Sequence, residues 1–441
     1  MSAIDPYLLV RAGSLYVAAM TTAAVCLSRR PDRRTWSAAL LASLWNLPAL
    51  FALHVAAERV GWWRYDARGG LLAGLPVDLW LSWAWLWGAV PALAGPALPL
   101  ALVAAVALAV DVVLMPATTP VVVLGHWWLA GDLVGVVVAL IPAQLLARWT
   151  VRDERLAGRA VLQVVTFTGL VVVLLPTIAI AGSATTWVNP LERPIWQIGV
   201  IVQALAVPAI IGITAVQEFV TRGGGTPVPF DPPRRLVTTG VYAYVRNPMQ
   251  LSGVLSLLLI GLAVRNVWVS AAGVMAHIYS VGLAGWDEDE DLRLRFGDGW
   301  TAYRRARRRW VPAWRPWQDP RRPTARLYVA AGCAMCSEVA DWFERRGVSG
   351  LAIVEAERHP SRTLSRITYE PGDGSRDASG VEAIGRALEH VHAGWAFAGF
   401  ILRLPIVFPI VQLVVDASGG EPRQVPRNPA IARSHSTRTG V

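Results

Sequence analysis

The sequence contains no lysine, only three cysteines and few charged residues of any kind. Charged side chains make up 16% of the 441 residues, whereas soluble domains carry roughly 25%. This deficit excludes an ordinary soluble enzyme. Three cysteines in so long a chain also exclude a secreted scaffold held by disulfides. All basic residues are arginine and the net charge is +10. In a membrane protein, cytoplasmic arginine produces such a charge without nucleic acid binding.

Long apolar segments dominate the sequence instead. Hydrophobic residues make up 54% of the chain, which includes 21 tryptophans, and the mean hydropathy is +0.42. A membrane-spanning helix needs roughly 20 mostly apolar residues. Nine segments are predicted to span: 7–28, 37–57, 71–94, 97–115, 128–147, 160–181, 195–219, 249–265 and 267–285. Gly131 and Asp132 interrupt the fifth of them.

Arginine clusters predict the orientation. They follow the first, fifth, seventh and ninth segments, at residues 29–34, 148–159, 222–235 and 304–309. Nine spans place all four clusters on one side, which the positive-inside rule makes cytoplasmic. The N-terminus is then outside and the C-terminus inside. The first segment has no basic residues before it and no small-residue cleavage site, so it is predicted to be an anchor. The arginine-only composition is typical of a bacterial protein, so a multi-pass inner-membrane protein is expected.

Chemistry concentrates in residues 223–312. The stretch GGGTPVPFDPP, which ends at Pro233, is too rich in glycine and proline for a helix. Asn247 followed by Pro248 is typical of a helix start. The eighth span therefore begins at the cytoplasmic face, beside Arg246. Exposed amides, the positive helix end and a guanidinium would together bind a carboxylate or a phosphate.

An acidic run, WDEDED, follows the ninth predicted span. Acids at the C-terminus of a helix oppose its dipole, and helical spacing offers partners to some of them. The predicted pairs are Asp289 with Arg293, Glu290 with Arg293 and Asp291 with Arg295. Glu288 has no such partner and is available to bind a cationic or hydroxyl-rich group. A hairpin turning at Arg265 and Asn266 returns the acids to the membrane face of Arg246.

An anion site facing a free carboxylate suits a zwitterionic, cationic cofactor. S-adenosylmethionine has a carboxylate, an amino group, a sulfonium and ribose hydroxyls. The glycine-rich dinucleotide fingerprint of soluble nucleotide folds is missing from the sequence. Any such site is therefore expected to be of a non-Rossmann type.

The same segment resembles the integral-membrane isoprenylcysteine carboxyl methyltransferase and phospholipid methyltransferase superfamily, over about 90 of the 441 residues. The family pattern is Gly-x-Tyr, Arg-His/Asn-Pro, a nearby Gly, Glu-Glu, and Phe-Gly followed by two Tyr. The matching positions are Gly240, Tyr242, Arg246, Asn247, Pro248, Gly253, Glu288, Asp289, Phe296, Gly297 and Tyr303. Gln250 stands where the family usually has Tyr, Asp289 replaces the second Glu, and Trp300 replaces the first Tyr. These departures concern the substrate more than the cofactor.

The resemblance implies that S-adenosylmethionine enters from the cytosol, that a lipophilic acceptor enters from the bilayer, and that the methyl group moves by in-line displacement. Catalysis is then mostly positioning in a water-poor site. Arg246 and Glu288 are the implied catalytic residues. The implied cofactor-binding residues are Gly240, Tyr242, Arg246, Asn247, Pro248, Gly253, Glu288, Asp289 and Tyr303.

Simpler roles stay open for these residues. Arg246 could be a positive-inside anchor, and Glu288 with Asp289 could be a solvated acidic patch. His277 lies eleven residues before Glu288, on the same face of a continuous helix. It could orient the substrate, act as a base or simply pack. The arginine-rich run at 304–309 is expected to face phospholipid rather than nucleic acid, and Arg11 is expected to snorkel.

The N-terminal block, residues 1–185, carries polar residues at membrane depth, which are costly unless paired or functional. They are Asn46, His54, Asp78, Asp111, His126 and Asp132. Aromatic residues at the span ends fit interfacial belts. The block also resembles membrane carotenoid cyclase and hydratase families, through the W-x-Y of Trp63–Tyr65, the Gly-x-Pro of Gly74–Pro76 and the Asp-x-x-x-x-Pro of Asp111–Pro116. That resemblance implies an isoprenoid site.

Near the C-terminus a predicted strand, Cys333-x-x-Cys336 and a helix follow one another. Such a unit is typical of thioredoxin-like redox domains, and a helix N-terminus favours thiolate. Further strands are predicted at 351–355 and 411–416, and a helix at 381–390. The segment resembles the DCC family of thiol-disulfide oxidoreductases, although Ala331 replaces that family's Asp. An active dithiol, an inactive binding module and a metal site all remain open, although a zinc site needs further ligands.

The predicted fold is an all-α polytopic membrane protein of about nine transmembrane helices, with a small C-terminal α/β thioredoxin-like cytoplasmic domain. The predicted parts are an N-terminal block at 1–185, a methyltransferase core at 186–318, a CxxC domain at 322–425 and a disordered tail at 426–441. The predicted function is S-adenosylmethionine-dependent methylation of a lipophilic acceptor, without a resident metal or nucleic acid. The alternatives are a membrane redox protein using Cys333 and Cys336, or an isoprenoid-modifying block fused to a methyltransferase.

Overall fold

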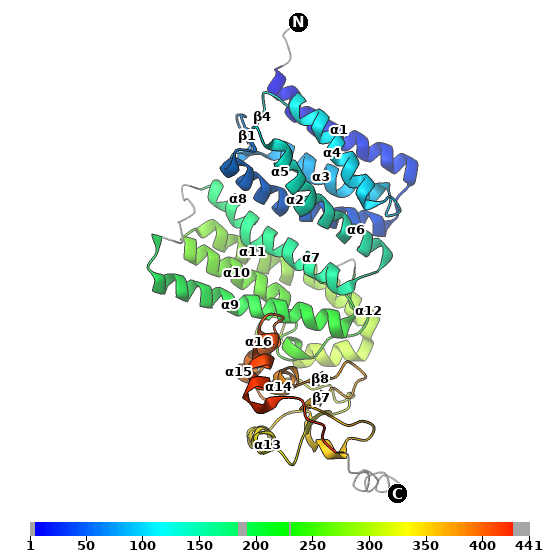
Figure 1. Cartoon of the computed structure of the whole chain (residues 1–441), viewed down its shortest axis with the longest axis vertical. Coiled ribbons are helices and arrows are strands. Elements are labelled where there is room, and N and C mark those ends of the chain that lie inside the picture. Colours follow the sequence, from blue (N-terminus) through cyan, green and yellow to red (C-terminus); the bar gives the residue numbers. More distant parts are fainter. Residues whose placement is uncertain (1–4, 184–191, 229–230, 427–441) are drawn as a thin grey trace. The chain divides into compact units, whose positions relative to one another are not determined.

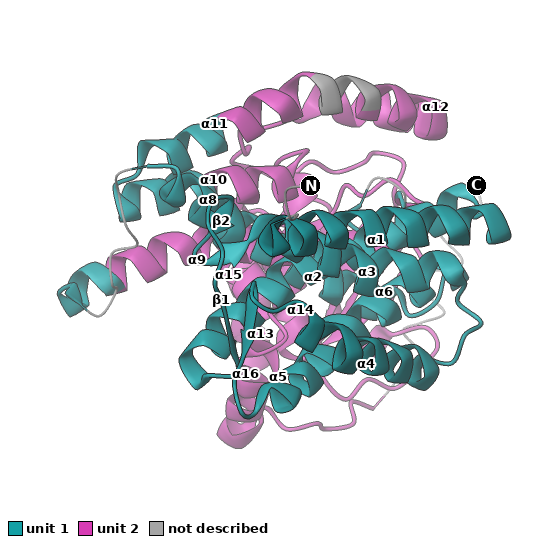
Figure 2. Cartoon of the chain, turned by 90° about the horizontal axis from the view of Figure 1, so that it is seen from above, with its two compact units in different colours: residues 1–198, 225–232, 257–274 teal, residues 199–224, 233–256, 275–441 magenta. Residues whose placement is uncertain are grey.

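A computed structural model describes residues 5–183, 192–228 and 231–426, apart from the side chains of 283–287 (Figure 1). The predicted tail at 426–441 and the predicted boundary at 185–186 thus fall almost wholly outside the described residues. The described chain is mostly helical, with a small sheet near its C-terminus. Contacts divide it into two compact units (Figure 2). Unit 1 comprises residues 1–198, 225–232 and 257–274, and unit 2 comprises 199–224, 233–256 and 275–441. The four-part division expected from the sequence stays a prediction.

Unit 1 is built mainly from helices, and the first two begin with side-chain caps. Asp5 accepts a hydrogen bond from the Tyr7 amide at the start of the first helix, and Asp32 accepts one from the Thr35 amide at the start of the second. The helices are α1 (Pro6–Arg29), α2 (Arg33–Val60), α3 (Val77–Ala94), α4 (Leu100–Ala117), α5 (Trp128–Gly135), α6 (Ile141–Arg152), α7 (Leu156–Thr168) and α8 (Leu175–Ala181). The π-helical turns η1 (Val136–Leu140) and η2 (Gly169–Leu174) join α5 to α6 and α7 to α8.

Small residues bring α2 and α3 together. A Cβ placed on Gly88 would lie 2.6 Å from the Ser43 amide nitrogen, so only glycine permits this approach. Close backbone contact through small residues is a standard mode of helix packing in membranes. Antiparallel strands β1 (Trp63–Tyr65) and β4 (Val122–Leu124) form a short ribbon, and β2 (Leu71–Leu72) pairs with β3 (Leu75–Pro76).

Unit 2 contains most of α9 (Ile195–Glu218), the π-helical turn η4 (Phe219–Gly223), the 3₁₀ turn η5 (Gly240–Ala243) and α12 (Leu283–Ala306). The helices α10 (Pro248–Val264) and α11 (Val267–Val281) each contribute to both units. α10 begins at Pro248, as the Asn-Pro signal predicts. Gly282 separates α11 from α12, and α12 itself is kinked at Gly297, where φ is 53°.

All nine predicted spans contain a helix, but the described residues do not confirm nine spans. Six are long and apolar enough to cross a membrane: α1, α2, α4, α5–α6, α7–α8 and α9 with η4. α3 is not among them, and α10 and α11 are shorter apolar helices of 17 and 15 residues. A seventh span is possible if the bent pair α15 (Ala393–Leu402) and Val407–Gly420 counts as one. The protein is therefore a membrane protein by the length and composition of its helices.

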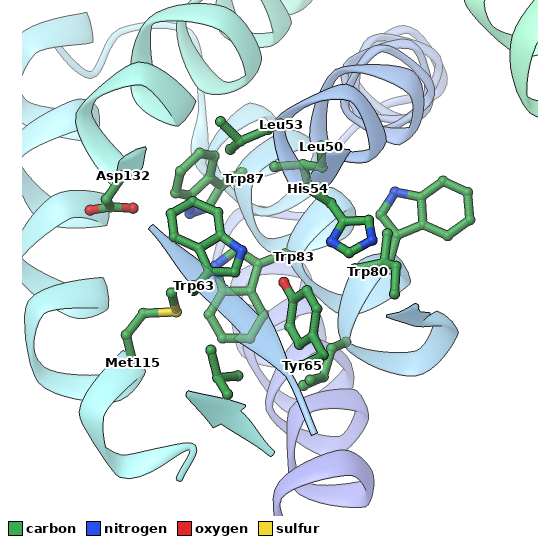
Figure 3. Close-up of a pocket in the computed structure, with 13 residues that line it drawn as sticks. Leu50, Leu53, His54, Trp63, Tyr65, Trp80, Trp83, Trp87, Met115 and Asp132 are labelled. Carbon is green, nitrogen blue, oxygen red and sulfur yellow. The ribbon is translucent and has the colours of Figure 1, made fainter. Parts of the chain in front are cut away.

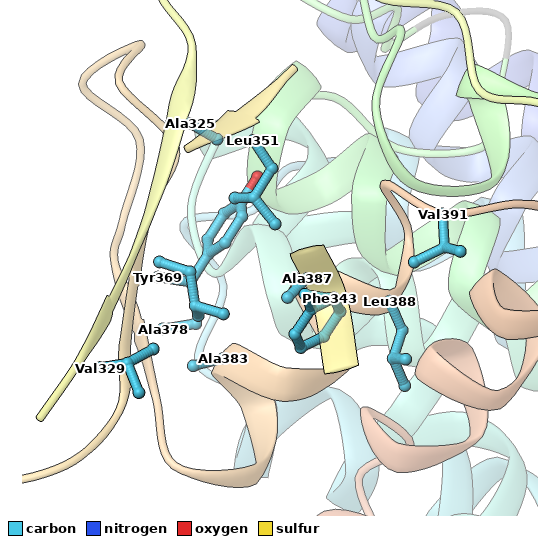
Figure 4. Close-up of a cluster of buried hydrophobic side chains, with 11 residues drawn as sticks. Ala325, Val329, Phe343, Leu351, Tyr369, Ala378, Ala383, Ala387, Leu388 and Val391 are labelled. Carbon is cyan, nitrogen blue, oxygen red and sulfur yellow. The ribbon is translucent and has the colours of Figure 1, made fainter. Parts of the chain in front are cut away.

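A four-stranded sheet lies in the C-terminal part of unit 2, in the order β6-β5-β7-β8. Its strands are β5 (Ala325–Val329), β6 (Leu351–Glu355), β7 (Thr368–Glu370) and β8 (Ala378–Ser379). β5 pairs parallel with β6 and antiparallel with β7. The helices α13 (Ala334–Arg346) and α14 (Val381–Leu388) supply Phe343, Ala383 and Leu388 to the buried core against this sheet (Figure 4).

The strand predicted at 411–416 is wrong. Residues 407–415 form the helix α16 (Val407–Val415), which follows α15 at a bend of 88°. The run VFPIVQLVV is rich in β-branched residues, which favour strands locally. The apolar segment from residue 393 onward is instead long enough to form two helices. The strand, CxxC and helix occur in the predicted order, while the thioredoxin-like assignment of the whole segment stays a prediction.

Candidate functional site around Arg246 and Asp289

Two segments far apart in sequence run side by side in unit 2. The amides of Arg246 and Asn247 donate to the carbonyls of Arg308 and Arg309, at 3.1 and 3.2 Å. The Ala313 amide donates to the Tyr244 carbonyl at 2.9 Å. These bonds fix the arginine-rich run beside the Arg-Asn-Pro motif. They also use two of the amides that the sequence predicts to be open to an anion.

Gly240 opens the turn that leads into the motif. It has a φ of +60°, and a Cβ there would lie 2.5 Å from Cγ of Glu218. Both the backbone conformation and the close contact therefore require glycine. The Thr239 hydroxyl donates to Glu218 at 2.9 Å. Gly240 is thus a packing residue against Glu218 in this structure, and it also lines a separate cavity with Thr239 and Arg222.

The Arg246 side chain points into a partly buried cluster of charges. Its Nη1 lies 3.6 Å from Oδ1 of Asp289, and its Cζ lies 5.5 Å from the centre of the Trp300 ring. Its side chain is 10% exposed, and neither Nε nor Nη1 has a hydrogen-bond partner. Burial lowers the pKa of Arg246 from its usual value. Buried donors without partners are costly, so this guanidinium has capacity for an added acceptor.

Asp289 is neutralised by arginines from several segments. It lies 2.8 Å from Nη2 of Arg309, 3.7 Å from Nε of Arg304 and 3.6 Å from Arg246. The predicted pairing with Arg293 is therefore wrong, because the arginine-rich run reaches this carboxylate first. The predicted pair of Asp291 with Arg295 is confirmed, at 3.2 Å.

Glu288 belongs to the same cluster. It hydrogen-bonds the Asn247 side chain and interacts with the charges of Arg309 and Arg246. The residue is exposed to solvent, yet protein atoms crowd its carboxyl group, and this desolvation raises its pKa above 4.5. Glu288 is the accessible acid of the cluster, whereas Asp289 is largely covered.

The acids lie in a different helical context from the one predicted. Because Gly282 breaks the helix, residues 288–291 belong to the first half of α12 and not to the end of α11. The acids therefore do not lie at a helix C-terminus, and the predicted conflict with the dipole is removed. The break also invalidates the helical alignment of His277 with Glu288. His277 instead contacts the ring of Trp310 edge-on, with ring centres 4.3 Å apart.

The remaining motif residues are mostly structural. The Tyr303 hydroxyl donates to the Tyr242 carbonyl at 2.7 Å, and both tyrosines are buried. Pro248 starts α10, and a Cβ at Gly253 would meet only open space. The structure therefore brings Arg246, Asn247, Glu288 and Asp289 together at one site, with Tyr242 and Tyr303 packed behind it.

Two partners of the site escape sequence reasoning. Arg309 belongs to a run that looks like a lipid-facing patch, and Trp300 stands at a departure from the family pattern. The kink at Gly297 and the hydrogen bonds between residues 246–247 and 308–309 bring these two residues to the cluster. The departure at Trp300 is the one available signal, because an indole offers Arg246 a cation–π contact.

The cysteine pair forms a second local site in unit 2. Cys333 is the N-cap of α13, and its sulfur accepts a hydrogen bond from the Cys336 amide at 3.4 Å. The Cys336 side chain also hydrogen-bonds this sulfur, and together these bonds lower the pKa of Cys333. Burial raises the pKa of Cys336 to about 12. Both thiols are free.

The polar residues predicted in unit 1 divide into paired and unpaired groups. Arg11 does not snorkel, because its Nε lies 2.6 Å from Asp78 and it also bonds the carbonyls of Arg68 and Gly69. The Asn46 amide donates to the Ala84 carbonyl, and His126 is exposed. His54, Asp111 and Asp132 are buried.

Comparison with known proteins gives no identification, since no family model, curated protein or solved structure matches the chain. The chemistry of the site therefore rests on its own side chains.

Proposed function

We propose that the protein is an integral-membrane S-adenosylmethionine-dependent methyltransferase that acts on a lipophilic acceptor. The observation that carries the proposal is the meeting of Arg246, Asn247 and Glu288 in unit 2, with buried guanidinium nitrogens left without hydrogen-bond partners. In this proposal Arg246 binds the cofactor carboxylate, and Glu288 binds its amino group or ribose hydroxyls. The site lies where α10 begins, and α10 and α11 are apolar helices that a lipophilic acceptor could approach from the bilayer.

The chemical demands on the protein are small. A sulfonium is an activated methyl donor, so the acceptor atom attacks the methyl carbon while the sulfur leaves with the bonding electrons. Positioning the two reactants is the main contribution. Arg246 and Asn247 are held by backbone bonds to residues 308–309, which makes their geometry rigid. A cytoplasmic location of this site, the bacterial inner membrane and an outside N-terminus belong to the same proposal.

The pH dependence of cofactor binding tests the role of Glu288. The pKa of this carboxyl is raised above 4.5 by desolvation, and only its ionised form attracts a cation. Affinity should be full above the raised pKa and fall as the pH drops through it, at a higher pH than an ordinary glutamate would give. Calorimetric titration from about pH 8 to about pH 5 measures this. Glu288→Gln should bind weakly at every pH, and Glu290→Gln, an exposed neighbour, should behave like the original protein. If Glu288→Gln kept the original pH dependence of cofactor affinity, Glu288 would not be a cofactor-binding residue.

A second candidate function is thiol–disulfide exchange. It is favoured by the position of Cys333 at the start of α13, where hydrogen bonds from Cys336 lower its pKa. The thiolate is the reactive form of cysteine. In this reading the sheet and the CxxC turn form a thioredoxin-like unit that exchanges electrons with a partner dithiol, and the DCC-type resemblance points the same way.

Alkylation rates separate a reactive dithiol from an inert pair. With iodoacetamide at about pH 7, Cys333 should react faster than an unperturbed cysteine, and Cys336 should react slowly because its pKa is raised to about 12. Peptide mass spectrometry assigns the modified residue, and Cys333→Ser should leave Cys336 largely unmodified. N-acetylcysteine in the same solution serves as the unperturbed reference. Equal rates at Cys333 and Cys336 would count against an asymmetric redox pair.

A further inference from the structure

Unit 1 contains a partly open cavity that the proposed methyl transfer does not use. It has a volume of about 60 Å³ and lies among α2, α3, α4, α5 and the β1–β4 ribbon (Figure 3). Its walls are mainly apolar and aromatic, with Trp63, Trp80, Trp83, Trp87 and Tyr65 among the lining residues. Small-molecule sites typically combine such walls with a few well-placed polar groups.

Three of the lining residues present buried polar atoms without partners. His54, Trp63 and Asp132 are 1%, 6% and 4% exposed. His54 Nδ1, Trp63 Nε1 and Asp132 Oδ2 make no hydrogen bond in the described structure. Trp63 Nε1 lies near the Tyr65 hydroxyl, but the two groups do not have the distance and angle of a hydrogen bond. Burying such groups without hydrogen bonds costs free energy. A polar ligand in the cavity would remove this cost.

The hydrogen-bonding roles of these atoms can be assigned. His54 Nε2 lies 2.8 Å from the Ala73 carbonyl oxygen. A carbonyl only accepts, so Nε2 carries the hydrogen, and Nδ1 of the neutral ring is an acceptor. Asp132 Oδ2 is a second acceptor, and Trp63 Nε1 is a donor. A ligand group that both donates and accepts hydrogen bonds would therefore satisfy these atoms.

Asp111 strengthens the demand for a donor. It is 2% exposed, its side chain interacts with those of Asp132, Trp83 and Trp87, and its Oδ2 has no hydrogen-bond partner. Neither acid makes an ion pair with any residue in the described part of the chain. Two adjacent carboxyl groups without a cation repel each other when both are ionised. A buried acid pair of this kind, in two helices long and apolar enough to cross a membrane, is a candidate functional site.

We propose that this cavity binds the hydroxyl-bearing end of a lipophilic small molecule. A hydroxyl both donates and accepts, so it can bond Asp132 or His54 and also receive the Trp63 N–H. A hydrocarbon would leave all three atoms unpaired, a quaternary ammonium has no donor, and a carboxylate would be repelled by the acid pair. The tryptophan walls contact the apolar atoms nearest the hydroxyl, since a cavity of about 60 Å³ admits only that end of the ligand. This site is separate in chemistry and residues from the proposed cofactor site.

Fluorescence quenching by 2-bromoundecanol tests the proposal, because bromine quenches indole on contact and at this position it lies beside the hydroxyl and the tryptophan walls. The full-length protein in lipid nanodiscs should show saturable quenching by the alcohol. The matched bromoalkane and the matched alkyltrimethylammonium should give only the non-saturable quenching of partition into lipid. Asp132→Leu, which removes an acceptor at similar volume, should weaken the alcohol at least about tenfold, the effect of one hydrogen bond. Asp5→Asn also removes one carboxylate, at a helix N-cap that asparagine suits equally well. It should leave the affinity for the alcohol unchanged.

Melting temperature and S-adenosylmethionine binding distinguish a loss of alcohol binding from unfolding and from failure of the proposed methyltransferase site. Asp132→Leu removes one of two adjacent buried acids that make no ion pair in the described structure, so the melting temperature should stay the same or rise. His54→Phe provides a second variant with the same expected loss of alcohol affinity. S-adenosylmethionine binding should be unchanged in both, because its proposed residues lie in unit 2. The proposal is overturned if the original protein gives no saturable quenching, if the alkane matches the alcohol, or if the ammonium binds more tightly than either.

Discussion

Replacing Arg246 with alanine should abolish most of the cofactor affinity while leaving the protein folded. Its Nε and Nη1 are buried without a hydrogen-bond partner, although Nη1 lies 3.6 Å from Asp289, so both can donate to a bound carboxylate. A hydrogen bond to a charged group contributes about 1.5–3 kcal/mol, so the dissociation constant should rise about 10- to 150-fold. Asp289 stays paired with Arg309 and Arg304, which protects the fold of the variant. Calorimetry with S-adenosylmethionine measures the loss, and the melting curve checks the fold.

The matched control is Arg293→Ala on α12. Arg293 is exposed and has no ion pair or hydrogen bond in the described structure, so its removal changes the net charge by the same amount without touching the cluster. Arg293→Ala should bind the cofactor normally. An Arg246→Ala protein that melts normally and binds like Arg293→Ala would show that Arg246 is only a positive-inside anchor.

Replacing Glu218 with alanine should strongly destabilise unit 2. Glu218 is fully buried at the end of α9 and pairs with Arg386 and with Arg403, whose Nη2 lies 2.8 Å away. Without it, two buried arginines share the single carboxylate of Glu389. Breaking a buried pair by removing one partner costs about 3–5 kcal/mol. The melting temperature should fall by about 10 °C, measured by intrinsic tryptophan fluorescence at a fixed scan rate.

A second substitution distinguishes charge imbalance from lost packing. Glu218→Ala combined with Arg403→Ala leaves Arg386 and Glu389 as a balanced pair, so part of the lost stability should return. Glu344→Ala, at an exposed position on α13, should melt like the original protein. A Glu218→Ala protein that melts within about 2 °C of the original would contradict the role of this network.

The network ties together parts that the sequence suggests are separate. Glu218 belongs to an apolar helix, whereas Arg386 and Arg403 lie in the segment predicted to be an independent domain. Ala396 and Phe400 of α15 also share a buried cluster with Val237 and Val241 near the Arg-Asn-Pro motif. The C-terminal segment thus helps to hold the loop that carries Arg246, since Tyr244 in that loop also bonds the Glu389 carbonyl at 2.9 Å.

Helices were the most predictable feature, because each long apolar run is visible in the sequence alone. The position of α10 follows from Asn247 and Pro248 for the same local reason. No proline in the sequence indicates the helix break at Gly282. This break places the acids at 288–291 in α12 and not at the end of α11. The strand predicted at 411–416 is wrong because β-branched residues favour strands locally, yet they lie in the helix α16.

Long-range pairing was the least predictable feature of the site. Local spacing offers Arg293 to Asp289, but the actual partners include Arg246 and Arg309, which reach it through the fold. Likewise, Arg11 and Asp78 pair across 67 positions of sequence. Helical spacing identifies only neighbours on one helix, so contacts of this kind need the three-dimensional structure.

Binding of S-adenosylmethionine to the purified full-length protein tests the central claim most directly. Calorimetry on the detergent-solubilised protein should give a micromolar dissociation constant, and Glu288→Gln measured beside it should lose that binding while keeping the original melting temperature. The absence of binding to a protein that is demonstrably folded would contradict the methyltransferase proposal and leave thiol exchange at Cys333 as the function to pursue.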